Sequence, residues 1–315
     1  MIPLLHCRVD GGWSRNAIMN DGLFISQVCK ELNLEYIGKD VQIDGLNLVG
    51  RESSKTSILS YVTSTKYKKK IEKESAIRVL VVSPKIVDNY KAILLDRGGG
   101  VIFSDEPEKT FYLIHNYLIN QQDFYIPIVP DTSISDTAII HPTAIVEDNV
   151  VIEKHVQIGA FSLIKSGSII RHDSVIGNHT TIGAEGYQVL RFDGVPYKIK
   201  HFGGVLIDEN VEIGDHCTVC NTIFDGFTRI GMHSKIDNYC QIAHYCNIGK
   251  NVIITPGVTI VGSVTIGDNC YIGAGATLMN KVTVYQGAIV GIGAVVIGNV
   301  KAGTTVMGNP AKQIF

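Results

Sequence analysis

Residues 230–272 read IGMHSKIDNYCQIAHYCNIGKNVIITPGVTIVGSVTIGDNCYI, and every sixth position is isoleucine. The same spacing extends in both directions along the chain. The positions of this register are Ile134, Ile140, Val146, Ile152, Ile158, Ile164, Ile170, Ile176 and Ile182, then Ile207, Ile213 and Val219, then Ile230, Ile236, Ile242, Ile248, Ile254, Ile260, Ile266, Ile272, Leu278, Val284, Val290 and Val296. All of them are aliphatic, so the chain contains a true six-residue repeat.

Two further features accompany the repeat. The position four residues after each aliphatic one is small or β-branched, as at Ser162, Cys240 and Val258, and glycine often follows the aliphatic residue directly. A six-residue period suits a unit of one short strand and one sharp corner, and three units close a triangular coil of 18 residues. The aliphatic side chains point inward, glycine tolerates the corner geometry, and each coil is stabilised by stacking on its neighbours. The repeat therefore predicts a mostly β fold, a parallel β-helix.

The repeat also divides the chain. Residues 1–125 lack it, and a helical stretch at 24–34 with a strand-like run at 77–82 predicts a small α/β domain there. Residues 126–315 form the predicted β-helix, with the proline-containing segment 125–130 as the junction. The register breaks between Ile182 and Ile207, which predicts a loop insertion at 183–206, and a shorter break follows Val219. Insertions in such folds lie on one face, often the binding face.

Bulk composition narrows the functional classes. The formal net charge of −2 argues against nucleic acid as a partner, and the lysine-rich run 66–73 is predicted to be a solvated helix face. The segment 1–9 is too short for a secretory signal and no apolar run reaches about 18 residues, so we expect a cytoplasmic protein without stable membrane insertion. Seven cysteines show no disulfide spacing, and four of them occupy small-residue slots, where packing explains them. We expect no metal.

The pattern aliphatic–Gly–x–x–small–x resembles the hexapeptide-repeat acyltransferase superfamily, whose fold is a left-handed β-helix. Membership would imply a homotrimer with active sites in the clefts between subunits. Segments 23–38, 58–67, 183–187 and 235–244 further resemble the UDP-3-O-(3-hydroxyacyl)glucosamine N-acyltransferases of the lipid A pathway. The resemblance covers most of the chain and implies a nucleotide-binding N-terminal domain.

In that family two aromatic residues six positions apart sandwich the uracil ring, and the resemblance places Tyr61 and Tyr67 in this role. It also assigns Tyr187, in the insertion, to substrate binding. Where the family usually has Asn-Pro between the two aromatics, this chain has Ser64-Thr65. The base, uracil or thymine, therefore stays open. The alternative is that these are two tyrosines of an ordinary domain.

Amide formation from a thioester needs a neutral amine, a proton acceptor and a donor for the oxyanion. Among ten histidines, His244 lies in the segment 241–244 that matches the family's catalytic motif, which implies a general base. One coil is 18 residues, so Gly262 is predicted to stack beside His244, with its backbone N–H as oxyanion donor. Asn280 follows one coil further. Asp237, on the preceding face, is a candidate to orient the imidazole.

The donor end departs from the lipid A family. Many members have a second histidine where this chain has Lys281. Residues 273–277 and 306–312 instead resemble the coenzyme A-dependent sugar N-acetyltransferases, in which amides of the final coils hold pantetheine and the C-terminal turn lies near the adenosine and phosphates. That resemblance implies cofactor contacts at Asn280, Gly291, Gly293, Asn309, Pro310 and Lys312. It makes acyl-CoA the predicted donor.

The sequence thus predicts an N-acyltransferase that moves an acyl group from acyl-CoA to the amino group of a dTDP- or UDP-linked amino sugar, in cell-surface polysaccharide or glycolipid synthesis. One alternative is the lipid A N-acyltransferase itself, with acyl carrier protein as donor. Another is a catalytically silent β-helix that only binds sugar nucleotide. A metal-dependent hydratase is disfavoured because no three histidines fall at facing positions of the coil.

Overall fold

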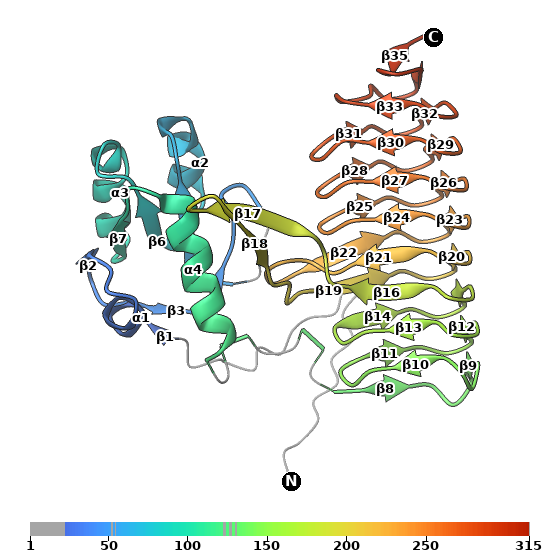
Figure 1. Cartoon of the computed structure of the whole chain (residues 1–315), viewed down its shortest axis with the longest axis horizontal. Helices are drawn as coiled ribbons and strands as arrows, with labels where there is room; N and C mark the ends of the chain where they lie inside the picture. Colours follow the sequence, from blue (N-terminus) through green and yellow to red (C-terminus); the bar gives the residue numbers. More distant parts are fainter. Residues whose placement is uncertain are drawn as a thin grey trace. The chain divides into compact units, whose positions relative to one another are not determined.

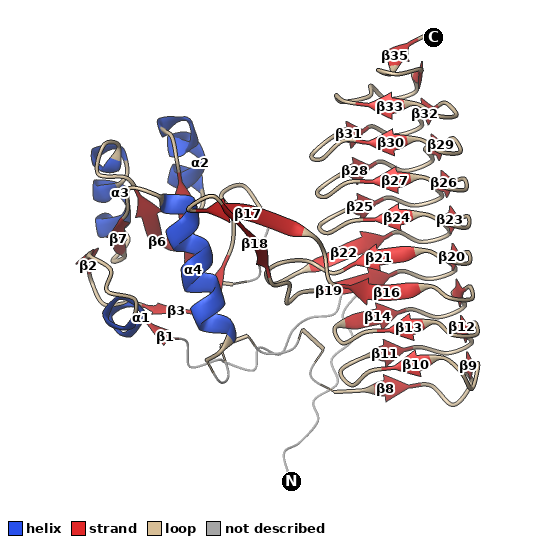
Figure 2. Cartoon of the chain, viewed as in Figure 1, coloured by secondary structure: helices blue, strands red, loops and turns tan. Residues whose placement is uncertain are grey.

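The computed structural model describes residues 23–51, 53, 55–121, 124–125, 128–129 and 131–314. The segment 1–9, considered above as a signal, lies outside them, as do Ile126, Pro127 and Pro130 of the predicted junction. The chain divides into two compact units, Met1–Ile126 and Pro127–Phe315. All helices of the described residues belong to the first unit (Figure 2).

The first unit is built on a five-stranded sheet of order β2-β7-β6-β5-β4. Its strands are β2 (Tyr36–Gly38), β4 (Gly45–Leu46), β5 (Ile58–Val62), β6 (Ile77–Val82) and β7 (Gly100–Phe103), and β1 (Leu23–Phe24) pairs separately with β3 (Gln42–Ile43). The helices are α1 (Ile25–Glu31), α2 (Lys68–Lys73), α3 (Lys91–Asp96) and α4 (Pro107–Ile119), with the 3-10 turns η1 (Thr65–Tyr67) and η2 (Val87–Asn89). Only β2 runs antiparallel in the main sheet.

The sequence pattern explains this unit. Five of the six residues of β6 are buried, as expected for a central parallel strand covered on both faces. The predicted helix at 24–34 is present as α1 and the predicted strand at 77–82 as β6, which confirms the small α/β fold. The lysines of the run 66–73 are exposed while Ile71 is fully buried, so this run is the solvated helix face that was predicted.

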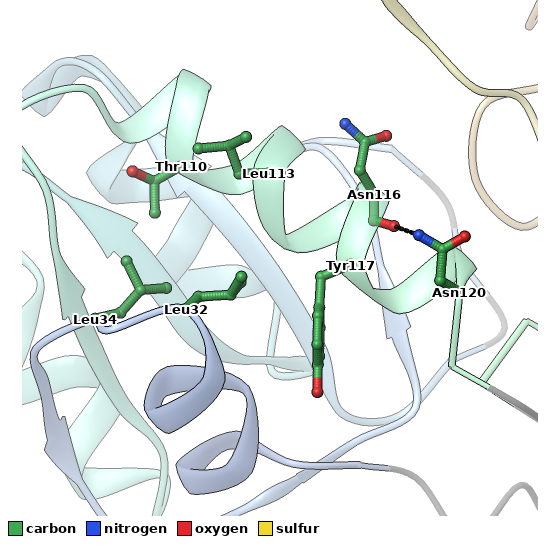
Figure 3. Close-up of a pocket in the computed structure, with 7 residues that line it drawn as sticks. All are labelled: Leu32, Leu34, Thr110, Leu113, Asn116, Tyr117 and Asn120. Carbon is green, nitrogen blue, oxygen red and sulfur yellow. Dashed lines mark hydrogen bonds between the residues drawn. The ribbon is translucent and has the colours of Figure 1, made fainter.

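One half-open hollow lies in this unit between the end of α1 and one face of α4 (Figure 3). It is lined by Leu32, Leu34, Thr110, Leu113, Asn116, Tyr117 and Asn120. The lining is apolar or neutral and offers no carboxylate, imidazole or thiol. We assign no chemistry to it.

The second unit is a left-handed parallel β-helix whose coils stack along one axis (Figure 1). Each coil contributes one strand to each of three sheets. The first sheet contains β8 (Ser133–Ile134), β11 (Val151–Ile152), β14 (Ser168–Ile170), β19 (Gly204–Ile207), β22 (Phe227–Ile230), β25 (Asn247–Ile248), β28 (Thr265–Ile266) and β31 (Thr283–Val284).

The second sheet contains β9 (Ile139–Ile140), β12 (Gln157–Ile158), β15 (Val175–Ile176), β20 (Glu212–Ile213), β23 (Lys235–Ile236), β26 (Ile253–Ile254), β29 (Tyr271–Ile272), β32 (Ile289–Val290), β34 (Thr305–Met307) and β35 (Lys312–Gln313). The third contains β10 (Ile145–Val146), β13 (Leu163–Ile164), β16 (Thr181–Ala184), β21 (Thr218–Cys220), β24 (Gln241–Ile242), β27 (Thr259–Ile260), β30 (Thr277–Leu278) and β33 (Val295–Val296). We call the turns that leave the first, second and third sheets the first, second and third corners.

The repeat register forms the core. Its aliphatic residues from Ile152 to Val296 are nearly all fully buried in one continuous cluster. Small polar residues of the repeat hydrogen-bond to backbone carbonyl groups at the corners. The Ser162 hydroxyl donates to the Gly177 carbonyl at 2.6 Å, and Thr180 Oγ1 donates to that of Gly214 at 2.7 Å. Cys217, Cys240, Cys246 and Cys270 are buried in the same slots, and burial raises the pKa of the Cys246 thiol to about 12. They are packing residues, as predicted.

Both breaks in the register leave the coil at the third corner. The first lies between β16 and β19 and contains an antiparallel hairpin of β17 (Gln188–Phe192) and β18 (Val195–Ile199), which projects from the stack (Figure 1). The second lies between β21 and β22. Despite both breaks, β16 still pairs with β21 and β19 with β22, so the coil continues, with one register shift between Ile182 and Ala184. The insertion predicted at 183–206 corresponds to the excursion between β16 and β19, which spans residues 185–203. The next coil places His244 at this same corner.

Candidate active site

His244 and Gly262 lie together at the third corner. The strands β24 and β27 pair in parallel with Gln241 opposite Thr259 and Ile242 opposite Ile260. This register carries the turn after β24 directly against the turn after β27. A Cβ atom on Gly262 would lie 2.6 Å from His244 Cε1 and 2.7 Å from its Nε2, so the imidazole rests against the bare Cα of that glycine. The 18-residue period predicts this contact, and the structure contains it.

A second imidazole, His201, lies beside the first. It comes from the end of the insertion, just after β18, and its ring centroid is 5.3 Å from that of His244 with an edge-on angle of 63°. His201 Nδ1 lies 3.0 Å from the carbonyl oxygen of Ile199. Burial, and then the proximity of His244, lower the pKa of His201 to about 4. His201 is therefore neutral near physiological pH.

Sequence reasoning did not select His201. The insertion has no six-residue period, so no offset connects position 201 to position 244. The available signal was weaker: a histidine at the end of a loop that the fold directs to one corner. In this chain the second histidine of the site comes from the insertion.

The second break in the register, residues 221–226, is hydrogen-bonded to the His244 turn and to the end of the insertion. The Tyr245 hydroxyl accepts the Phe224 N–H at 2.8 Å, which ties residues 221–226 to the corner of His244. The N–H groups of Phe202 and Gly203 bond to the Thr222 carbonyl at 3.1 and 2.8 Å. The end of the insertion, the second break and the His244 turn are thus joined by hydrogen bonds to backbone and side-chain oxygens, which fixes where His201 meets His244.

Asp237 lies elsewhere. It belongs to the turn between β23 and β24, which is the second corner, whereas His244 lies at the third. Its carboxylate accepts the Asn238 N–H at 2.7 Å, and Asn238 in turn accepts the Asp215 N–H. Within one chain the structure does not bring Asp237 to His244, because residues one hexad apart occupy different corners. Asp237 is a corner-capping residue here.

The residues predicted for the donor fall into two groups. Asn280 is exposed at the third corner, one coil beyond Gly262, whose carbonyl accepts the Lys281 N–H at 3.1 Å. The others lie at the C-terminal end on the second-corner side: Gly291, Gly293, Asn309 and Pro310 in its turns and Lys312 in β35. The Val295 N–H bonds to the Gly308 carbonyl at 3.0 Å, so the C-terminal turn folds over the last coil.

Of the predicted substrate tyrosines, two belong to the first unit and one to the insertion. In the first unit, the Tyr61 hydroxyl donates to Glu108 Oε1 at 2.7 Å and its ring packs 4.9 Å from that of Phe111. Burial and the bond to Glu108 raise the pKa of Tyr61. Tyr67 is half-buried against the same domain core. Tyr187, in the insertion, is 81% exposed and available to a ligand.

Two further observations concern the described residues as a set. Among the described residues, no three or more His, Cys, Asp or Glu side chains are grouped so that they could hold a metal ion. In the same part of the chain, every helix is too short or too polar to cross a lipid bilayer.

Comparison with known proteins identifies the family. The model "Bacterial transferase hexapeptide (six repeats)" matches residues 227–262 and 245–280, and "Hexapeptide repeat of succinyl-transferase" matches 263–301. The UDP-3-O-acylglucosamine N-acyltransferase of Campylobacter lari is 40% identical over 260 residues, which is 77% of this chain and 79% of that protein. The chain belongs to the UDP-3-O-acylglucosamine N-acyltransferase family.

Other family members agree with this assignment. The enzyme of that name from Campylobacter jejuni subsp. doylei is 40% identical over 76% of this chain and 78% of its own length. The one from Maricaulis maris is 45% identical over 83 residues, 26% of this chain and about a quarter (24%) of that relative. Among solved structures, the UDP-N-acetylglucosamine acyltransferase of Campylobacter jejuni has a TM-score of 0.46 at 24% identity, covering 56% of this chain and 73% of that one. The names of the family members favour the lipid A alternative over an acyl-CoA enzyme of another pathway.

Proposed function

We propose that this protein is an N-acyltransferase that moves an acyl group from a thioester to the amino group of a UDP-linked 3-O-acylglucosamine. The observation that carries the proposal is the contact between His244 and Gly262, both of which lie within the matched hexapeptide segments. The family name printed for the relatives supports the acceptor. The predicted homotrimer and cytoplasmic location belong to this proposal.

The geometry suits the reaction. The amine nitrogen attacks the thioester carbonyl carbon, and His244 accepts the proton that the nitrogen loses as the C–N bond forms. Negative charge develops on the carbonyl oxygen, and we assign the backbone N–H of Gly262 as the donor to it. The C–S bond then breaks, and the proton held by His244 passes to the departing thiolate. Because Gly262 has no side chain, oxyanion and imidazole can occupy one small space.

Replacing His244 by alanine tests the general base. We expect turnover to fall about 10²–10⁴-fold, because the amine then has no proton acceptor, while the melting temperature and the oligomeric state stay as in the parent. Turnover is measured by mass spectrometry of the acylated sugar nucleotide. Turnover within about threefold of the parent in the His244→Ala protein would remove His244 from the mechanism.

The identity of the donor is the second question. The C-terminal turn resembles the coenzyme A-dependent enzymes and position 281 is lysine, whereas the family name favours the lipid A reaction and its carrier-protein donor. One assay offers acyl-CoA and acyl carrier protein thioesters, each with UDP- and dTDP-linked amino sugars. The mass of the product then distinguishes the two donor hypotheses. A protein that transfers from neither donor, and shows no thermal shift with millimolar coenzyme A or UDP-sugar, would be the silent β-helix.

A further inference from the structure

The Nε2 atom of His201 is the starting point. It is buried, and among the described residues it has no hydrogen-bond partner. A buried polar atom without a partner is destabilising, so its retention calls for a functional explanation. The atom lies against the Cα of Gly186 and next to the ring of His244, in the corner that holds Gly262.

The neighbouring nitrogen decides which chemistry this atom offers. Nδ1 of His201 lies 3.0 Å from the Ile199 carbonyl oxygen, which can only accept, so Nδ1 carries the hydrogen. A neutral imidazole with hydrogen on Nδ1 has a lone pair on Nε2. Burial disfavours protonation of this ring. Nε2 is therefore an acceptor that needs an N–H or O–H donor.

We infer that His201 Nε2 accepts a hydrogen bond from the amino group of the acceptor sugar. The inference rests on the proposed function and adds a specificity residue to it. A primary amine has two hydrogens and one lone pair. His244 takes one hydrogen, His201 holds the other, and the lone pair remains directed at the thioester carbon. A hydroxyl has one hydrogen and cannot satisfy both imidazoles, so the pair selects an amine over an alcohol.

This role differs from that of a second base. His201 is neutral near physiological pH, and it accepts a hydrogen bond without taking the proton. It contacts the nucleophile directly, and its effect is on orientation. Loss of such an acceptor reduces discrimination between amine and non-amine ligands as well as rate.

The experiment compares two substitutions. His201→Gln keeps an acceptor near the position of Nε2, whereas His201→Leu keeps the bulk and removes it. We expect kcat/KM for the amino sugar nucleotide to fall about 10–100-fold in the leucine variant and to stay within about fivefold of the parent in the glutamine variant. The acid limb of the pH–rate profile should keep its position in the glutamine variant. His233→Asn is the matched control, since His233 is an exposed first-corner residue whose φ of +63° asparagine tolerates.

A binding measurement separates this inference from the proposed function. Calorimetry at pH 8 with UDP-glucosamine and UDP-N-acetylglucosamine reports preference for a free amine. The parent should prefer the free amine and His201→Leu should lose that preference, whether or not transfer is seen. Normal kcat/KM in the leucine variant, equal impairment of both variants, or an unchanged binding preference would each overturn the inference. Absence of transfer by the parent from every donor would overturn only the proposed function.

Discussion

Gly262 acts through the side chain that it lacks. Its Cα supports the imidazole of His244, and a methyl group there would approach two ring atoms closer than 3 Å. Such contacts require the ring to move. A displacement of about 1 Å at a reacting group can cost about 100-fold in rate.

Gly262→Ala should therefore lower kcat by about tenfold or more, with little change in melting temperature. The matched control is Gly298→Ala. Gly298 lies in the same column of the third corner, two coils further along, and a Cβ there would meet no atom within 4 Å. Steady-state kinetics of both variants provide the measurement. Equal activities would show that the His244 ring does not depend on the glycine.

At the residue scale, the sequence predicts those contacts that follow from the length of the repeat. His244 and Gly262 are 18 residues apart, so their contact follows from the length of one coil. Asp237 was assigned without such an offset, and the structure places it at another corner. His201 could not be predicted because it reaches His244 through a hairpin whose length and direction have no repeat.

At the scale of elements, the insertion contributes a buried titratable group, the imidazole of His201. The unfolded-state pKa of histidine is about 6.5, and His201 has a pKa of about 4 in the folded protein. Between these values the unfolded chain binds more protons than the folded one. Stability therefore increases with pH across this window and is lost as the pH falls from about 6.5 towards 4.

We expect this group to remove on the order of 2 kcal/mol of stability between pH 8 and pH 5. Chemical denaturation at both pH values measures the loss. In His201→Gln the loss should be smaller by about that amount, because glutamine does not titrate, while in His233→Asn it should equal that of the parent. The same pH dependence in the parent and the glutamine variant would contradict the burial of an uncharged His201.

Elements built from the repeat were predictable, and those without it were less so. The strand in each hexad can be predicted because its aliphatic residue is buried in the single core of the β-helix. The hairpin β17–β18 was expected only as a loop, since its alternation is weak and its side chains are mostly half-buried or exposed. In the first unit, α1 and β6 show clear patterns, but the sheet order depends on contacts distant in sequence.

At the scale of the whole molecule, the β-helix is a stack in which each coil contacts its neighbours, so its ends need covering. The strand β34 continues the second sheet beyond β32, and β35 turns back antiparallel across it. Val306 is buried at this end of the core. The last complete coil is thereby protected.

Deleting residues 302–315 should expose the edge of β32 and the last core residues. Unpaired edges and uncovered apolar surface favour association between chains. We expect a lower melting temperature and a shift to large species in sedimentation velocity, with the parent as reference. A truncated protein that sediments and melts like the parent would show that the final strands do not seal the stack.

The placement of both breaks at one corner has a consequence for variation. Because the coil closes beneath each excursion, a loop there can be lengthened, shortened or exchanged without moving a strand of any sheet. The β-helix can thus be conserved while the loop varies, and His201 lies on the loop. Family members could exchange this loop, and with it the nucleophile that they recognise in the acceptor, while the coils stay the same.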